Sequence, residues 1–250
     1  MTQDPQLILR VPFQVSSAET DMYGRLRLGA LVNLVIQPAV ESADRLGFGF
    51  RHLQPLNLFW VLSRISIEIA KPLRWNNSGE TETWPKSLDR LMYLRDFFIR
   101  DSKGNEVVKA TSGWLTVDAT SKRSRLDPAL DVSPFELLKN RHALSSLPDK
   151  LAGVDGETAA TVTSAFYDID INQHVTTTRY FDWMMDTFTP EFHQKNYPVF
   201  VAANFLREIK PGEIIQIRRS MNSNNSWHFE GFNNSRQIIA FRGVIRFGEQ

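Results

Sequence analysis

Three side chains able to do acid–base or hydrogen-bonding chemistry alternate along one short segment in the second half of the chain. Asp170, Asn172 and His174 occupy every second position between Ile169 and Val175. In an extended segment alternate side chains point the same way, so we expect a carboxylate, an amide and an imidazole on one face. Imidazoles and carboxylates are the usual general acids and bases of enzymes. The segment is therefore the candidate catalytic site.

The residues after this segment predict a helix start, which would add hydrogen-bond donors to the site. Thr176, Thr177 or Thr178 can cap a helix predicted over 178–188. Free backbone N–H groups at such a terminus stabilise a developing oxyanion. Glu208, which we place on the apolar strand-like stretch around 199–209, is a further candidate. The alternative is that Asp-x-Asn-x-His is only a capping and turn segment, because Asp and Asn favour such positions.

The elements that must position these residues occur twice. In the first half a strand-like segment precedes an apolar stripe at helical period over 28–43, with Pro38 inside it, and further strands follow. The second half repeats this order. The strand-like segments are 7–15, 58–70, 81–85, 91–100 and 107–117, then 161–166, 199–209, 213–219, 227–232 and 238–247. This duplication predicts an α+β fold with an N-terminal domain over 1–125, a linker over 126–157 and a C-terminal domain over 158–250.

The repeat also aligns residue by residue. Pairing segment 19–26 with 168–175 matches Asp21 to Asp170, and it places Arg25 where the second copy has His174. The segment 67–69 pairs with 207–209, which matches Glu68 to Glu208. A carboxylate in both copies is compatible with a structural role as well as a catalytic one. The first copy lacks the imidazole, so we expect acid–base chemistry only in the second.

Composition excludes several classes of protein. Of 250 residues 42% are hydrophobic, and 29 Lys plus Arg against 28 Asp plus Glu give no electrostatic reason to expect nucleic acid binding. The absence of cysteine excludes disulfides, Cys-ligated zinc and a cysteine nucleophile. Serine-hydrolase, zinc-protease, P-loop and dinucleotide motifs are absent too, so we expect no metal and no cofactor.

Other features of the sequence bear on location and on the remaining histidines. The sequence has no apolar run of about 18 residues and no signal-peptide pattern at its start, so we expect no membrane insertion and a cytoplasmic location. We interpret the histidines outside the segment, which have no partner spacing, as surface residues. They are His52, His142, His193 and His228.

The motif around His174 resembles the acyl-acyl carrier protein thioesterases of plants and bacteria. Asp170-Ile-Asn-Gln-His-Val is followed by Arg179-Tyr180 and Trp183. The similarity runs from Val11 to Phe247 and includes Ser63-Arg64-Ile-Ser-Ile-Glu68, Glu82-Thr-Trp-Pro85, and Asn204-Phe-Leu-Arg-Glu208 followed by Pro211-Gly212. The resemblance implies two tandem hotdog domains, each a long helix wrapped by an antiparallel sheet. It also implies hydrolysis of the thioester between a fatty acyl chain and the carrier protein's phosphopantetheine arm, which releases free fatty acid and terminates chain elongation.

Carried over by position, the family's catalytic set falls on Asp170, Asn172, His174 and Glu208. This sequence departs from the plant enzymes at Thr176 and Thr177, where they carry Asn-Asn, and at Ile209, where they carry Cys. Glu208 is then a general base acting on water directly or through His174, while Asn172 and helix amides hold the thioester oxygen. In the rival route Asp170 is a nucleophile.

The resemblance also implies an acidic acyl carrier protein as partner, so we expect a basic surface to receive it. Fusion of two hotdog units satisfies the pairing that single units obtain by dimerising, so we expect a monomer or a homodimer. The alternatives are an acyl-CoA thioesterase and a non-catalytic acyl-binding hotdog module. The candidate basic clusters are Lys122, Arg123 and Arg125 in one place and Arg207, Lys210, Arg218 and Arg219 in another.

Overall fold

The computed structural model describes residues 7–128, 130–222 and 224–249, and these fall into two compact units. Unit 1 contains the residues up to Val15, Leu34–Ala70 and Asn76–Pro148. Unit 2 contains Ser16–Asn33, Lys71–Trp75 and the residues from Asp149 onward. Two segments of the first half therefore fold with the second unit. The domain bounds predicted from the sequence divide the chain differently from these units and stay a prediction.

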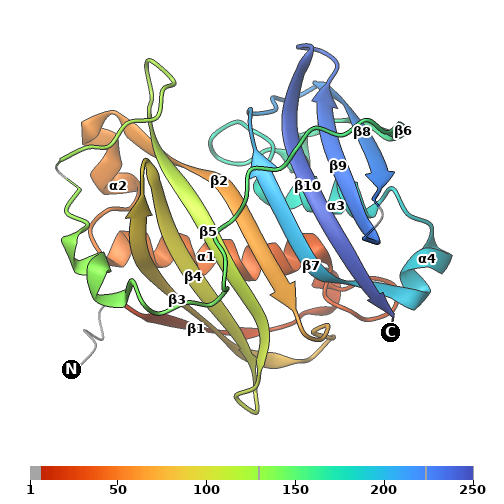
Figure 1. Cartoon of the computed structure of the whole chain (residues 1–250), viewed down its shortest axis with the longest axis horizontal. Helices are drawn as coiled ribbons and strands as arrows, with labels where there is room; N and C mark the ends of the chain where they lie inside the picture. Colours follow the sequence, from red (N-terminus) through yellow and green to blue (C-terminus); the bar gives the residue numbers. More distant parts are fainter. Residues whose placement is uncertain (1–6, 129, 223, 250) are drawn as a thin grey trace. The chain divides into compact units, whose positions relative to one another are not determined.

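Unit 1 is an antiparallel sheet with a helix on one face. The strands run in the order β1-β3-β4-β5-β2, and helix α1 (Leu28–Arg45), whose residues from Leu34 belong to this unit, crosses the sheet (Figure 1). Val35, Ala39 and Ala43 of α1 are buried, as the apolar stripe predicts. Pro38 lies inside this helix without ending it. The strands are β1 (Leu9–Gln14), β2 (Leu58–Ile69), β3 (Ser78–Asp89), β4 (Met92–Asp101) and β5 (Glu106–Asp118).

Short helical pieces complete unit 1. Helix α2 (Phe50–Leu53) and the 3₁₀ turn η2 (Gln54–Leu56) could not be predicted from the sequence, because neither is long enough to show a period. The 3₁₀ helix η3 (Ser133–Leu138) lies inside the predicted linker. Its residues Phe135 and Leu138 are buried in one apolar cluster with Trp84. The first part of the predicted linker is therefore packed into unit 1.

A buried carboxylate ties the outer strands of unit 1 together. Glu82 on β3 is fully buried, and its carboxylate lies 2.7 Å from Nε of Arg10 and 3.3 Å from Nη1 of Arg100. Arg141 contacts the same carboxylate. Burial alone would raise the pKa of Glu82, but the hydrogen bond from Arg10 and the charges of Arg141 and Arg100 lower it below its usual value.

We expect Glu82→Gln to lower the free energy of unfolding by about 2 kcal/mol at neutral pH, since a buried hydrogen-bonded charge is lost. A depressed carboxyl pKa contributes stability above the unfolded-state value and loses it as the pH falls through the folded-state value. The difference between wild type and variant should therefore shrink below about pH 4. Urea unfolding at neutral and acidic pH measures it. Glu80→Gln, on a partly exposed neighbour, is the control; an equal gap at both pH values would contradict the prediction.

Unit 2 repeats this architecture. Its strands run in the order β7-β10-β9-β8-β6, and helix α3 (Thr177–Met185) lies on one face of the sheet (Figure 1). Tyr180 and Phe181 of α3 are buried, and the Tyr180 ring lies 4.9 Å from that of Phe241 on β10. The strands are β6 (Glu157–Thr163), β7 (Asn196–Phe205), β8 (Ile214–Met221), β9 (Ser226–Asn233) and β10 (Ile238–Glu249).

Three short helices flank the strands of unit 2. Two are 3₁₀ turns, η1 (Ser17–Glu19) and η4 (Phe166–Asp168), and one is helix α4 (Pro190–Lys195), which the sequence analysis missed. Both 3₁₀ turns immediately precede the polar segments aligned above. Across the described residues, no helix is long and apolar enough to span a bilayer.

Candidate active site

The segment that carries Asp170, Asn172 and His174 is a closed turn. Ile169 and Val175 form an antiparallel bridge, and the Asp170 amide donates to the His174 carbonyl oxygen at 2.8 Å. Gln173 has a left-handed backbone with φ of 64°. The expectation of an extended segment with three polar groups on one face is therefore wrong, because the chain reverses within it.

Asp170 closes this turn with its own side chain. Its Oδ1 accepts the backbone N–H of Asn172 at 2.8 Å and that of His174 at 3.4 Å. Aspartate commonly closes turns in this way, and this agrees with the alternative interpretation of the motif as a capping and turn segment. The side chain of Asn172 is exposed. Asp170 thus fixes the backbone that carries His174, whatever further part it takes in chemistry.

His174 and Glu208 meet in the structure. Nε2 of His174 lies 3.1 Å from Oε2 of Glu208, and the two side chains are 26% and 33% exposed. The carboxylate therefore orients the imidazole, and both groups remain open to a small substrate. Of the four residues expected from the resemblance, these two are in direct contact.

Glu208 lies beyond the strand on which we expected it. Strand β7 ends at Phe205, and the amides of Leu206 and Arg207 both donate to the Ala240 carbonyl oxygen, so the chain leaves the sheet there. Arg236 donates to the Glu208 carbonyl oxygen at 3.1 Å. The loop that presents Glu208 is thus held in place by hydrogen bonds.

The start of α3 adds two features to the site. Thr176 is the N-cap residue, but its side chain makes no capping hydrogen bond. Tyr180, one turn further on, is buried. Burial raises the pKa of Tyr180, with the nearby Asp170 and Glu208 charges adding to the shift. The buried phenol therefore lies near these two carboxylates, a position that could not be predicted from the sequence although the Arg179-Tyr180 motif marked the residue.

The first copy of the turn has the same backbone. The Asp21 amide donates to the Arg25 carbonyl oxygen at 2.7 Å, and Oδ1 of Asp21 accepts the amides of Tyr23 and Arg25 at 2.9 Å each. Gly24, with φ of 71°, has the left-handed backbone of Gln173. The predicted match of Asp21 with Asp170 is confirmed by this pattern.

The predicted match of Glu68 with Glu208 is wrong. The amide after the second turn, Val175, donates to Ile209, whereas the amide after the first turn, Leu26, donates to Leu73. Ile209 therefore corresponds to Leu73, and Glu208 corresponds to Pro72. Glu68 is an exposed residue of β2. The first copy thus lacks both members of the histidine–glutamate pair.

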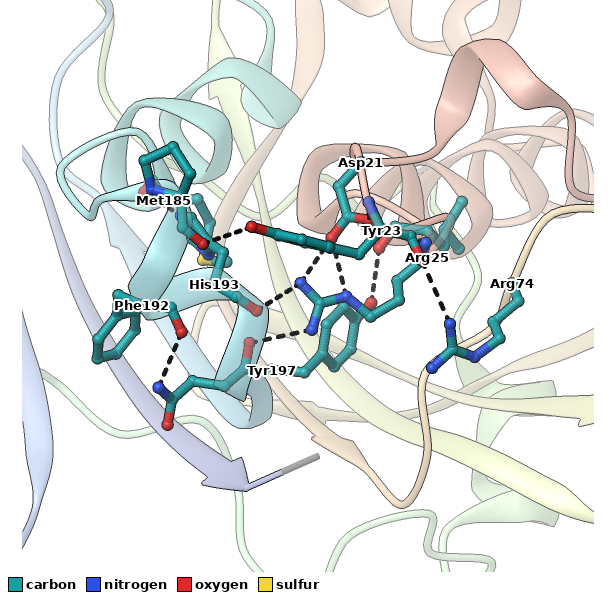
Figure 2. Close-up of polar contacts among 11 residues, drawn as sticks. Asp21, Tyr23, Arg25, Arg74, Met185, Phe192, His193 and Tyr197 are labelled. Atoms are coloured by element: carbon teal, nitrogen blue, oxygen red, sulfur yellow. Dashed lines mark hydrogen bonds and ion pairs between the residues drawn. The ribbon is translucent and has the colours of Figure 1, made fainter.

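Arg25, at the position of His174, has a structural role instead (Figure 2). Its guanidinium is buried and donates to Oδ2 of Asp21 at 2.9 Å, to the His193 carbonyl oxygen at 2.7 Å and to the Asn196 carbonyl oxygen at 3.3 Å. Tyr23 donates to the Pro190 carbonyl oxygen at 2.8 Å. The first turn therefore anchors helix α4.

His193 lies at the centre of this anchor (Figure 2). The residue is half-buried, and its Nε2 lies 3.0 Å from the Met185 carbonyl oxygen. Its interpretation as a surface histidine without partners is wrong, because the helix that positions it could not be recognised from six residues.

A pocket of about 300 Å³ lies beside the first turn. Charged side chains line much of it, among them Arg27, Arg179, Asp182 and Asp186. Burial raises the pKa of Asp182 and of Asp186, against the charge of Arg179. The wall therefore combines these charges with apolar side chains, among them Leu26, Leu28, Met185 and Phe188.

The fold and the site together define a class of protein. Two copies of a helix on an antiparallel sheet, with a histidine–glutamate pair in one copy only, make a double-hotdog protein of the thioesterase type. The profile of the acyl-ACP thioesterase N-terminal domain matches residues 7–128, and that of the acyl-ACP thioesterase C-terminal domain matches residues 153–246. The chain belongs to the acyl-ACP thioesterase family.

Similar proteins come from plants and bacteria. Oleoyl-acyl carrier protein thioesterase 2 of Arabidopsis thaliana, a chloroplastic protein, is 26% identical over 81% of this chain and 60% of its own length. The palmitoyl-acyl carrier protein thioesterase of the same plant is 24% identical, over 84% of this chain and 54% of its own length. The chain thus spans little more than half of the length of these relatives.

Solved structures agree in fold. An acyl-ACP thioesterase from Bacteroides thetaiotaomicron is 25% identical with a TM-score of 0.91, over 99% of this chain and 100% of that one. The 12:0-ACP thioesterase from Umbellularia californica is 18% identical with a TM-score of 0.84, over 98% of each chain. The predicted pair of tandem hotdog folds is confirmed.

Proposed function

We propose that the protein hydrolyses the thioester of fatty acyl-acyl carrier protein and releases free fatty acid. The contact between His174 and Glu208 at 3.1 Å carries the proposal, because it provides a base in a site open to substrate. Membership of the acyl-ACP thioesterase family supports the substrate class. The relatives named for oleoyl and palmitoyl chains support a fatty acyl group.

The reaction needs a base, an oxyanion site and a proton for the leaving thiol. Glu208, directly or through His174, takes a proton from water, whose oxygen attacks the thioester carbonyl carbon. Asn172 and the amides at the start of α3 hold the carbonyl oxygen as its charge develops. The C–S bond then breaks, and the proton held by the pair passes to the leaving sulfur.

Asp170 distinguishes this route from its rival. As nucleophile, its carboxylate would attack the thioester and form an anhydride that water then cleaves. In the structure Oδ1 of Asp170 holds two backbone amides of the turn, which supports the orienting role. Label in the Asp170 carboxylate after a single turnover in ¹⁸O-labelled water would rule out direct attack of water on the thioester, because only water attack on the anhydride at Cγ of Asp170 places it there.

A thiol-release assay tests the function itself. We expect the protein to release thiol from acyl-carrier protein with a higher kcat/KM than from the coenzyme A thioester of the same acyl chain. A preference for coenzyme A would favour the acyl-CoA thioesterase alternative. Stoichiometric binding of acyl-carrier protein without thiol release would favour the non-catalytic module. A cytoplasmic location and a monomeric or homodimeric state remain part of the proposal.

A further inference from the structure

Three exposed apolar side chains lie on the segment that leads to His174. Phe166, Tyr167 and Ile171, here called the entrance patch, are 83%, 93% and 94% exposed. The rings of Phe166 and Tyr167 contact each other edge to face with centroids 5.4 Å apart. Side chains this apolar and this exposed, grouped in one loop, are typical of an interaction surface.

The entrance patch and the catalytic pair belong to one hydrogen-bonded assembly. Ile171 lies inside the turn that Asp170 closes, three residues before His174. Ser164, two residues before Phe166, donates through Oγ to the Lys210 carbonyl oxygen at 2.6 Å, and its own carbonyl accepts the Gly212 amide. The loop that carries the patch is thus fastened to the loop that carries Glu208.

The duplication shows that the fold does not need the two aromatic side chains of the patch. In the first copy the positions of Phe166 and Tyr167 are taken by Ser17 and Ala18, and the same 3₁₀ turn and polar turn form there. Since the backbone closes equally well with small side chains, the aromatic rings serve something other than folding. They occur only in the copy that has the histidine–glutamate pair.

Exposed basic side chains flank the catalytic glutamate. Arg207 and Lys210, which flank Glu208, are exposed. Two acidic side chains of these loops are engaged by other residues: Asp168 is paired with Arg179 at 2.7 Å, and Glu213 accepts Asn233 Nδ2 at 2.7 Å. Glu208 itself is partly exposed. An acidic partner is therefore attracted to the rim of the patch.

Several of the other expected basic residues contact neighbouring groups, whereas Lys122 and Arg123 of unit 1 are exposed. Arg219 is half-buried and donates to the Thr187 carbonyl oxygen at 2.6 Å, and Arg218 faces Glu230. Arg125 is paired with Asp118 and Asp127. Of the two predicted clusters, the exposed charge next to the catalytic pair comes from Arg207 and Lys210.

We propose that the entrance patch, with Arg207 and Lys210, is the surface on which the acyl carrier protein docks. The inference rests on the proposed function and names the part of the protein that receives its substrate. An acidic carrier protein here would place the start of its flexible arm next to His174 and Glu208. A second copy of this chain on the same surface would instead cover the catalytic pair.

The test replaces the two aromatic residues with their counterparts in the first copy, and Ile171 with serine. We expect Phe166→Ser/Tyr167→Ala/Ile171→Ser to raise KM for acyl-carrier protein about tenfold or more, as loss of interface anchors does, with kcat little changed. The kcat/KM for the N-acetylcysteamine thioester of the same acyl chain, which has no carrier protein, should be unchanged. Arg207→Glu/Lys210→Glu should raise the same KM and weaken its salt dependence. Met22→Ser, at the position of Ile171 in the first copy, is the matched control.

Each outcome decides one of the two proposals. Unchanged KM in the triple variant, or an equal loss on both substrates, overturns the docking surface and leaves the hydrolase intact. Binding of a carrier protein with an amide-linked acyl chain, measured by calorimetry, is independent of turnover. If the wild-type protein binds this probe and the triple variant does not, the docking proposal is supported even if the protein releases no thiol. A change in the sedimentation coefficient of the triple variant would show that the patch joins two copies of the chain. That result would overturn the docking proposal.

Discussion

His174→Ala lowers kcat for acyl thioester hydrolysis by about 10²–10⁴-fold, the usual contribution of a positioned general base. Glu208→Gln has an effect of the same order, because the imidazole loses the carboxylate 3.1 Å from its Nε2. The double variant is little worse than either single variant, since the two residues act as a unit. Thiol release under saturating substrate measures all three.

The control for this prediction is His52→Ala, on exposed α2 of unit 1, which should keep wild-type kcat. The midpoint of thermal unfolding should hardly move in His174→Ala, because a partly exposed polar pair contributes less than about 1 kcal/mol. A variant at His174 or Glu208 that retains full kcat would remove the pair from the reaction and, with it, the proposed mechanism.

Arg25 is the first-copy equivalent of His174. We expect Arg25→Ala to destabilise the fold, whereas His174→Ala should hardly do so. The variant loses a buried guanidinium that binds Asp21 and the carbonyl oxygens of His193 and Asn196. We expect a loss of about 3 kcal/mol in the free energy of unfolding, since these acceptors are left without their donor. Chemical denaturation measures this loss.

Arg27→Ala is the matched control for the anchor. Arg27 is exposed and donates to the Ala18 carbonyl oxygen, so its loss should cost well under 1 kcal/mol, roughly what a surface contact contributes. Hydrogen exchange adds a local measurement, because α4 should lose protection in Arg25→Ala before the strands of unit 2 do. Equal stability of the two variants would show that the anchor is dispensable.

Sequence patterns predicted the fold well where they were long. The apolar stripe over 28–43 became α1, and segment 58–70 became β2 with an end one residue away. The alignment of Asp21 with Asp170 held because both side chains close the same turn, a local property of the residues themselves. Helix α4 was not predicted because six residues do not define a helical period.

The site was predicted in part. The motif led to His174 and Glu208, but the pattern of alternate polar residues was interpreted as a strand when it belonged to a turn. Tertiary closure decided this: the bridge between Ile169 and Val175 and the left-handed Gln173 have no signature in single residues. The match of Glu68 with Glu208 failed because it relied on identical residue types in short segments. The backbone hydrogen bond from Leu26 to Leu73 shows that the counterpart of Glu208 is Pro72.

The anchor at Arg25 also bears on how such a chain can evolve. To regain a second reacting centre, the first copy would need a histidine at Arg25 and a carboxylate at Pro72 together. A histidine alone would give up the hold on α4 before any catalysis appeared, and a carboxylate alone would have no imidazole to orient. Each substitution alone either destabilises the fold or adds no working catalytic pair. The difference between the two copies is therefore expected to persist in evolution.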